Sequence, residues 1–404
     1  MNGDQTHTQP KRHCMVVHAH YPIGETRVER EARALVDNGY AVDVICLRGG
    51  SEPAEAIQDG IAVYRLPVKR HKRSGAGVQL LEYLTFFVLA FFKLAALHRR
   101  RRYAVVQVHN LPDFLVFAAL LPKLSGARVI LDLHDLMPEF YAARFATGLA
   151  NWRVRLICWQ ERLSCGFADH VITVTEPWRQ TLIQRGVPAE KTSVVMNVAD
   201  DRVFHRQPPA VSPVVEDGHF NLIYHGNLTQ RYGLDEVLRA VDLVCQSVPH
   251  IHLTVHGWGD YRQALMDLAD ELGMGQHVHF SSRALLTAEL PELIRSADVG
   301  VVPYRRDVFT DGILPTKLME YVALGVPVIA ARTSAISAYF DESMVEFFTP
   351  GDAQDLARCI LALYSDRARL ARLAQAAEKF NQLYNWPAQR AAYVRLVDQL
   401  AGFG

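Results

Sequence analysis

Short β-branched runs alternate with longer helical patterns along most of this chain, and this alternation restricts its fold more than any other feature. The strands predicted in the first half are 15–18, 42–47, 61–66, 105–109, 129–133 and 171–174, with helices beginning near Val28, Asp113, Trp152 and Pro177. The strands predicted in the second half are 220–224, 251–256, 278–280, 299–303 and 328–330. The pattern predicts an α/β fold of doubly wound parallel sheets with helices on both faces.

The alternation stops once, at a stretch rich in proline, valine and acidic residues over 207–218, which has the composition of a linker. The chain of 404 residues is long enough for two cores. We therefore predict an N-terminal Rossmann-like domain over 1–206, a second Rossmann-like domain over 207–385 and a C-terminal helix over 386–404. Ligands of such sheets bind at the carboxyl ends of the strands, here in a cleft between the domains.

Composition restricts the partners and the compartment. The 43 basic residues equal the 43 acidic ones, so no overall basic field favours nucleic acid as a partner. The six cysteines form no C-x-x-C pair or zinc-like cluster, which is typical of reduced thiols and predicts no structural metal. The polar residues before Cys14 lack the apolar core of a secretory signal, so we expect a cytoplasmic protein.

One apolar segment, 80–97, has basic residues on both sides. A helix buried in the core and a helix on a membrane surface both explain it, and its apolar part is shorter than the roughly 20 residues of a spanning helix. Anionic headgroups attract basic clusters. The two alternatives stay open, and the membrane-surface helix predicts a protein peripheral on the inner face of the cytoplasmic membrane, touching an anionic lipid surface through four arginines: Arg99, Arg100, Arg101 and Arg102.

Two segments of the first half end predicted strands with candidate site residues. Gly24 lies in a strand-to-helix turn, where a glycine either serves the turn or lets backbone amides approach a phosphate. His134 follows the strand that ends at 133, where it either lines a ligand site or caps the next helix. No full G-x-G-x-x-G motif is present, which disfavours a nicotinamide dehydrogenase.

The second half carries two glycine loops at strand ends. Gly226, Asn227 and Arg231 lie between a predicted strand and a helix start, where amides and a guanidinium favour phosphate. Arg231 in such a loop is otherwise a solvated arginine. Gly257 follows the next strand, where the absence of a side chain lets a flat ring lie against the backbone.

The segment 301–330 is the most informative, since a polar loop, a short helix and a buried strand follow in order. Pro315 suits the first turn of that helix and Gly325 suits its end. Glu320 lies within the apolar helix and needs hydrogen-bond donors. The vicinal hydroxyls of a ribose would satisfy it, and an internal ion pair is the alternative.

This segment resembles the retaining family-four (group 1) glycosyltransferases of the GT-B fold. The family pattern P-x-K-x-x-E-Y-x-A-x-G-x-P-V-I-A is matched by a run that includes Pro315, Lys317, Glu320, Tyr321, Ala323, Gly325, Pro327 and Val328. Three positions depart from the family. Gly312 stands where a first glutamate is usual, with Asp311 beside it, and Asn227 and Tyr232 stand where arginine and lysine are usual.

The resemblance implies retaining transfer of a sugar from a nucleoside-diphosphate sugar to an acceptor hydroxyl, with no cofactor and no tightly bound metal. It places three residues in catalysis: His134 near the donor sugar, and Arg231 and Lys317 on the leaving diphosphate. It implies nine donor-binding residues: Gly24, Gly226, Asn227, Arg231, Gly257, Asp311, Gly312, Lys317 and Glu320. It also implies that the helix over 386–404 crosses back to the first domain.

The predicted partners are a sugar nucleotide and a glycan or lipid-linked acceptor, such as a growing polysaccharide in envelope or exopolysaccharide synthesis. Two other functions fit the same fold. A sugar-nucleotide epimerase would need no acceptor, and a nucleotide-binding module without catalysis would explain the uncharged residues Gly312, Asn227 and Tyr232 at positions that are usually charged.

Overall fold

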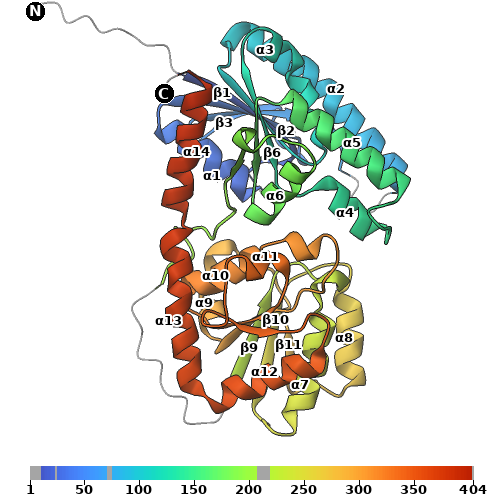
Figure 1. The fold of residues 1–404 in the computed structure, drawn as a ribbon, viewed down its shortest axis with the longest axis vertical. Coiled ribbons are helices and arrows are strands. Elements are labelled where there is room, and N and C mark those ends of the chain that lie inside the picture. Colours follow the sequence, from blue (N-terminus) through green and yellow to red (C-terminus); the bar gives the residue numbers. More distant parts are fainter. Residues whose placement is uncertain (1–10, 23–24, 71–74, 207–218, 403–404) are drawn as a thin grey trace, which may run out of the picture. The chain divides into compact units, whose positions relative to one another are not determined.

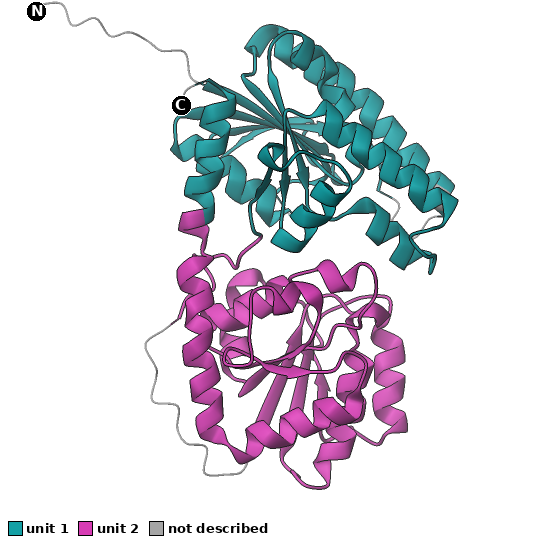
Figure 2. Ribbon diagram, viewed as in Figure 1, with its two compact units in different colours: residues 1–196, 389–404 teal, residues 197–388 magenta. Residues whose placement is uncertain are grey.

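A computed structural model describes residues 11–22, 25–70, 75–206 and 219–402 (Figure 1). The chain divides into two compact units (Figure 2): unit 1 is Met1–Met196 with Gln389–Gly404, and unit 2 is Asn197–Ala388. Each unit is a sheet covered by helices, which confirms the predicted α/β fold. The predicted linker over 207–218 lies outside the described residues.

Unit 1 contains an eight-stranded sheet in the order β3-β4-β2-β1-β5-β6-β7-β8. Its strands are β1 (Lys11–His20), β2 (Tyr40–Leu47), β3 (Glu55–Gln58), β4 (Ile61–Leu66), β5 (Val105–His109), β6 (Arg128–Leu133), β7 (His170–Thr173) and β8 (Thr192–Val194). Seven strands are parallel, whereas β3 pairs antiparallel with β4 at the edge. The sequence did not predict β3 or β8.

Helices cover both faces of this sheet (Figure 1). They are α1 (Thr26–Asp37), α2 (Ala76–Arg101), the 3-10 helix η1 (Asp113–Ala119), α3 (Leu120–Leu124), α4 (Met137–Arg144), α5 (Trp152–Phe167), α6 (Glu176–Gln184), the 3-10 helix η2 (Ala189–Lys191) and α14 (Trp386–Leu400). The helix predicted from Asp113 therefore begins as a 3-10 helix, and that predicted over 80–97 is longer at both ends.

Unit 2 contains a six-stranded parallel sheet in the order β11-β10-β9-β12-β13-β14. Its strands are β9 (Phe220–His225), β10 (Ile251–His256), β11 (Val278–Phe280), β12 (Val299–Val302), β13 (Val328–Ala331) and β14 (Glu346–Phe348). In both sheets the strand order reverses once, between β1 and β5 in unit 1 and between β9 and β12 in unit 2. Ligands of open α/β sheets bind at the carboxyl ends of strands at such a reversal.

The unit 2 helices are η3 (Gln230–Tyr232), α7 (Leu234–Cys245), α8 (Arg262–Glu271), η4 (Thr287–Glu289), α9 (Leu290–Arg295), η5 (Thr310–Gly312), α10 (Thr316–Leu324), α11 (Ser334–Ser337), α12 (Ala353–Ser365) and α13 (Arg367–Leu383). Gly325 ends α10 with a φ of 77°, a left-handed conformation that glycine adopts without a Cβ clash. Pro315 precedes the helix as its N-cap, one position earlier than predicted.

The C-terminal helix α14 contributes to unit 1 from Gln389 onward. Tyr393 and Val397 are fully buried there. Asp398 accepts hydrogen bonds from Lys11 Nζ at 2.7 Å and from Tyr40 Oη at 2.6 Å, so the helix is held at its far end by β1 and β2. The side chain of Gln389 accepts a bond from the backbone of Met196 at 2.8 Å.

Candidate functional site

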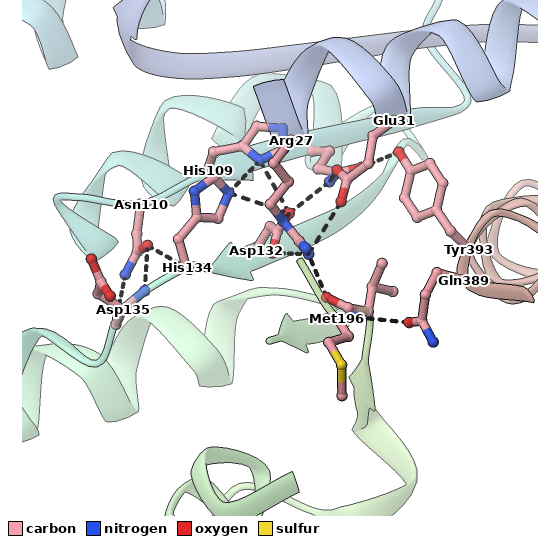
Figure 3. Close-up of polar contacts among 12 residues, drawn as sticks. Arg27, Glu31, His109, Asn110, Asp132, His134, Asp135, Met196, Gln389 and Tyr393 are labelled. Carbon is pink, nitrogen blue, oxygen red and sulfur yellow. Dashed lines mark hydrogen bonds and ion pairs between the residues drawn. The ribbon is translucent and has the colours of Figure 1, made fainter. Parts of the chain in front are cut away.

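Unit 1 contains a cluster of polar side chains, the unit 1 polar group, formed by Arg27, Gln107, His109, Asp132 and His134. Asp132 lies at its centre on β6 and is fully buried. Arg27 on α1 donates from Nε to Oδ2 at 3.1 Å and from Nη2 to Oδ1 at 3.0 Å (Figure 3). This bidentate pair is the geometry in which a guanidinium holds a carboxylate most strongly. The carboxylate therefore has a fixed orientation at the carboxyl end of the sheet.

His134 lies against this carboxylate. Its Nε2 is 3.1 Å from Nδ1 of His109 and 3.5 Å from Oδ2 of Asp132, and its side chain is 20% exposed. Its backbone N–H donates to Oδ1 of Asn110 at 2.8 Å. The helix that follows, α4, has Leu136 as its N-cap and no side-chain cap bond, so the alternative that His134 caps that helix is wrong.

The pKa values of the two histidines are shifted in opposite directions. Burial alone would raise the pKa of Asp132, but Arg27 and His134 hold it well below its usual range. Burial lowers the pKa of His109 to about 4, so this ring is neutral. Burial acts in the same direction on His134, yet the Asp132 charge outweighs it, and the pKa of His134 is raised. The charged form is thus favoured at the partly exposed His134 and disfavoured at His109.

Three ligand atoms of His109, Asp132 and His134 lie within 4.8 Å of one another, a spacing that a metal ion tolerates. Arg27, however, already occupies both oxygens of Asp132, and its positive charge disfavours a cation beside it. The geometry thus suits a protonated histidine better than a metal. The predicted absence of a bound metal stays a prediction.

A hydrogen-bonded chain joins the group to α14, which the sequence reasoning missed. Gln107 on β5 donates from Nε2 to Glu31 at 2.8 Å and to Asp132 at 3.2 Å. Its Oε1 accepts from the hydroxyl of Tyr393 at 2.6 Å. The available signal was a glutamine between valines on a buried strand, since a buried amide needs partners. Gly24, the predicted phosphate glycine of this unit, lies outside the described residues.

In unit 2 the two predicted glycine loops lie against each other. The N–H of Gly226 donates to the carbonyl of His256 at 2.9 Å. A Cβ on Gly257 would lie 1.8 Å from the carbonyl oxygen of Gly226, and one on Gly259 would lie 1.9 Å from that of Leu228. Only glycine permits this approach, because no side-chain carbon fits at such distances.

Lys317 lies beneath the first of these loops, buried at the start of α10. A Cβ on Gly226 would be 3.1 Å from its Cε. Its ammonium donates to the hydroxyl of Tyr304 at 3.1 Å and lies 5.1, 5.0 and 4.9 Å from the ring centres of Tyr224, Tyr232 and Tyr304. Burial lowers the pKa of Lys317 to about 8, against the opposing charge of Glu320.

Tyr232, at the position where the resemblance led us to expect a lysine, stacks on Tyr304, with ring centres 4.4 Å apart and planes at 9°. Its ring therefore forms part of the aromatic surroundings of Lys317 instead of adding a second cation. Aromatic faces attract an ammonium and hold it without neutralising its charge.

Glu320 has an internal partner. Its Oε2 lies 2.6 Å from Nε2 of His225 at the end of β9, and Nδ1 of His225 lies 2.9 Å from the hydroxyl of Tyr321. An internal histidine–carboxylate contact therefore stands where the sequence offered an ion pair as the alternative, although the Glu320 side chain stays 18% exposed. His225 was missed by the sequence reasoning, and its signal was its position at the carboxyl end of a strand.

The remaining predicted residues of unit 2 lie in neighbouring loops. Asn227 is exposed, and Arg231 is half-buried on η3 with its guanidinium 5.5 Å from the Phe309 ring centre. Asp311 accepts from the backbone N–H and the hydroxyl of Ser334, at 2.9 and 2.7 Å, and so anchors the start of α11. Gly312 ends η5 beside it.

The four arginines predicted to touch a membrane differ in exposure and in their partners. Arg101 donates to Asp43 at 2.8 Å and to the Tyr64 hydroxyl at 2.7 Å, so it is an internal partner of β2 and β4. Arg99, Arg100 and Arg102 are exposed. The prediction for Arg101 is therefore corrected, because its charge is used within unit 1.

Two family models match the chain. The "Glycosyl transferase 4-like domain" covers residues 24–197 and "Glycosyl transferases group 1" covers residues 219–366. The chain is a group 1 glycosyltransferase. Curated relatives of this glycosyltransferase include the putative colanic acid biosynthesis glycosyl transferase WcaI of Escherichia coli K12, 27% identical over 66% of this chain and 67% of that protein.

A second relative of this glycosyltransferase is the GDP-mannose-dependent alpha-(1-6)-phosphatidylinositol monomannoside mannosyltransferase of Mycolicibacterium smegmatis, 31% identical over 43% of this chain and 46% of that protein. The match thus spans about half of that relative. Among solved structures, sucrose-phosphate synthase of Thermosynechococcus elongatus has a TM-score of 0.78 at 21% identity and covers 98% of this chain and 100% of that chain.

Anabaena HepE in complex with UDP-glucose has a TM-score of 0.72 at 17% identity and covers 96% of this chain and 99% of that chain. At such identities the likeness establishes the fold of this glycosyltransferase, which is GT-B.

Proposed function

We propose that this glycosyltransferase transfers a sugar, with retention of configuration, from a nucleoside-diphosphate sugar to an acceptor hydroxyl. The observation that carries the proposal is the position of Lys317, whose buried ammonium lies directly under the Gly226 loop. A charged group is costly to bury, and Glu320, the acidic residue whose charge acts on Lys317, also contacts His225, so a further counter-charge would stabilise the ammonium. A diphosphate lying on the loop would supply that counter-charge.

In this proposal the remaining donor contacts surround the loop. A flat nucleoside would lie beside the paired loops of Gly226 and Gly257, and Glu320 would accept bonds from the ribose hydroxyls beside its bond to His225. Asn227 and Arg231 extend from the same loop toward the phosphates. Asp311, Gly312 and Gly24 stay proposed contacts of the donor, with Asp311 also anchoring α11.

Departure of the nucleoside diphosphate places negative charge on the β-phosphate. Lys317 and Arg231 would stabilise that charge, since fixed cations in a partly dry site need no rearrangement during the reaction. The donor phosphate oxygen takes the proton of the acceptor hydroxyl, which attacks from the same face. His134, held by Asp132, would orient the donor sugar and would not act as a nucleophile.

The acceptor and the location are proposed from the relatives. WcaI is described as acting in colanic acid biosynthesis and the mycobacterial enzyme as modifying a phosphatidylinositol mannoside. We propose a growing polysaccharide or a lipid-linked glycan as the acceptor, and a cytoplasmic location at the inner membrane face. The catalysis needs no cofactor and no tightly bound metal, and no nucleic acid takes part.

The test is a turnover assay with purified protein, a panel of UDP-, GDP- and ADP-sugars, and short glycan acceptors. Nucleoside diphosphate release that depends on the acceptor, with a product of retained anomeric configuration by NMR, is the expected result. Release without an acceptor and with an inverted sugar centre would favour the epimerase. Tight nucleotide binding without any turnover would favour the non-catalytic module.

A further inference from the structure

The long helix α2 has two faces of different character. Phe86, Ala90, Leu94 and Leu97 form a stripe that is buried against the core of unit 1. The opposite side leaves large apolar side chains in solvent, among them Leu80, Leu81, Leu84, Val88 and Phe92, with Phe92 66% exposed. By length and composition α2 could cross a membrane, but its buried stripe is part of a folded core. It is therefore suited to lie on a surface.

The charges that interrupt the apolar segment of α2 are directed away from this exposed side. Glu82 is buried, and its Oε1 lies 3.2 Å from Nε2 of His18 on β1. Lys93 donates to Glu55 on the edge strand β3 at 2.6 Å and lies over the ring of Tyr64. Glu82 is thus buried in unit 1 and Lys93 is paired within it, so the exposed side of α2 is mainly apolar along several turns.

Helix α5 repeats this arrangement. Trp152, Leu156, Trp159 and Leu163 recur at intervals of four, three and four residues, which places them on one side of the helix. All four are exposed, the two tryptophans by 68% and 60%. A globular protein rarely leaves such a stripe in water unless a partner covers it.

The two helices belong to one side of unit 1. Phe87 of α2 packs edge-on against Phe114 of η1, and Phe117 of η1 packs against Phe167 of α5, so η1 supports both helices. Figure 1 shows α2 and α5 on the same side of the eight-stranded sheet. The short helix α3, which follows η1, adds exposed leucines at Leu121 and Leu124.

The exposed charged residues on α5 and at the C-terminal end of α2 are arginines. Arg153, Arg155 and Arg162 of α5 are exposed, whereas Glu161, the acidic residue of that helix, is buried and bound by Arg185 at 2.9 Å. Arg99, Arg100 and Arg102 at the end of α2 are exposed as well. An apolar strip with tryptophans and a border of arginines complements an anionic bilayer, whose headgroups attract arginine and whose interface accommodates indole rings.

We propose that α2 and α5 together form a docking face for an anionic phospholipid bilayer. The face is defined by Leu80, Leu81, Leu84, Val88, Phe92, Trp152, Leu156, Trp159 and Leu163, with the exposed arginines of both helices. Helix α5 contributes the tryptophans, and its exposed apolar side was not recognised in the sequence. Insofar as this face presents a lipid-linked acceptor to the enzyme, the inference rests on the proposed function.

The experiment measures binding of the full chain to sedimenting vesicles. One set of vesicles is phosphatidylcholine alone, and the other is phosphatidylcholine with about 30% phosphatidylglycerol. Binding to the anionic vesicles is expected, with quenching of tryptophan fluorescence by brominated lipid. The paired variant Trp152→Ser/Trp159→Ser should weaken the partition coefficient by at least about tenfold. Arg153→Gln/Arg155→Gln should weaken it on anionic vesicles alone.

The matched control is Leu243→Ser/Leu383→Ser, which removes two exposed leucines of unit 2 and should bind as the wild type does. Circular dichroism and melting temperature check that each variant folds. The proposal would be overturned if the protein did not bind vesicles, or if the tryptophan variant bound as well as the wild type. It would also be overturned if the wild type formed a dimer without lipid and the tryptophan variant were a monomer. Turnover of a water-soluble acceptor without vesicles tests the proposed function separately, because it does not need this face.

Discussion

The hydroxyl of Tyr393 donates a hydrogen bond to the side-chain oxygen of Gln107 over 2.6 Å, across 286 residues of sequence. Gln107 in turn donates to Glu31 and Asp132, so the C-terminal helix α14 is joined to the carboxylate that faces His134. The last helix of the chain is therefore a structural part of the unit 1 polar group, and shortening the chain before Tyr393 would remove one of its supports.

We predict that Tyr393→Phe destabilises unit 1 by about 1–3 kcal/mol, because the buried oxygen of Gln107 loses its donor while the ring still fills its place. Urea unfolding followed by circular dichroism measures the change. Tyr364→Phe, at a half-exposed tyrosine of unit 2, is the control and should leave unfolding nearly unchanged. Equal stability of both variants would mean that the Tyr393 bond contributes nothing.

Asp132→Asn should lower the pKa of His134, since the carboxylate charge is what raises it. A histidine with a raised pKa stabilises the fold below its unfolded value, and that contribution is lost as pH rises through the folded value. The variant should therefore lose stability mainly at acidic pH, in addition to the roughly 3–5 kcal/mol cost of leaving Arg27 buried without its partner. NMR titration, with His134→Gln for assignment, measures the pKa, and an unchanged value would contradict the prediction.

Gly257→Ala should disrupt the two glycine loops of unit 2, because its Cβ would lie 1.8 Å from the backbone of Gly226. We expect a loss of stability of about 2 kcal/mol or more and no measurable nucleotide binding. Gly275→Ala is the matched control, since a Cβ there meets nothing within 4 Å. If the two variants had the same melting temperature, the close approach of these loops would be wrong.

Nucleotide affinity should fall as pH rises through about 8, where Lys317 loses its proton. The sign for stability is the opposite. Because burial lowers the folded pKa from 10.5, the unfolded chain binds more protons between about pH 8 and 10.5, and this residue's contribution to stability rises with pH across that window. Calorimetric titration with a nucleoside diphosphate measures the affinity. The titrations run from about pH 6.5 to about pH 9.5, which brackets the Lys317 pKa of about 8.

Lys317→Met is the variant that tests this assignment. It should bind weakly at every pH and show no change near pH 8, because the titrating group is gone. A wild-type affinity that stays flat across the range would show that the diphosphate does not depend on the Lys317 charge.

The sequence predicted four strands with the bounds that they have in the structure, among them β11 at the edge of the unit 2 sheet. The bounds of β4, β5, β10 and β11 are those predicted, since short β-branched runs between helical patterns leave little choice. The edge strand β3 was missed because its side chains alternate between solvent and the sheet. Asp59 and Gly60, with φ values of 49° and 80°, form the turn to β4, and an Asp-Gly pair is a hairpin signal that the sequence did contain.

The site was predictable where one motif carries it and not where distant segments meet. The family pattern marked Lys317 and Glu320, but not the bond from Glu320 to His225 on β9. His134 was indicated as a candidate by its position at a strand end. The roles of Arg27, Asn110 and Tyr393 depend instead on contacts between segments far apart in the chain. Pairings of that kind follow from the packed structure and leave no local pattern.

The central claim is that unit 2 binds a nucleoside diphosphate on the Gly226 loop through Lys317 and Glu320. Calorimetric titration of UDP, GDP and ADP into the wild type, Lys317→Met and Glu320→Gln tests it most directly, with Lys379→Met at an exposed lysine as the control. The account predicts binding of one of these nucleotides by the wild type and the control, and a loss of at least about tenfold in both site variants. Binding that is unchanged in both site variants, or absent with every nucleotide, would contradict it.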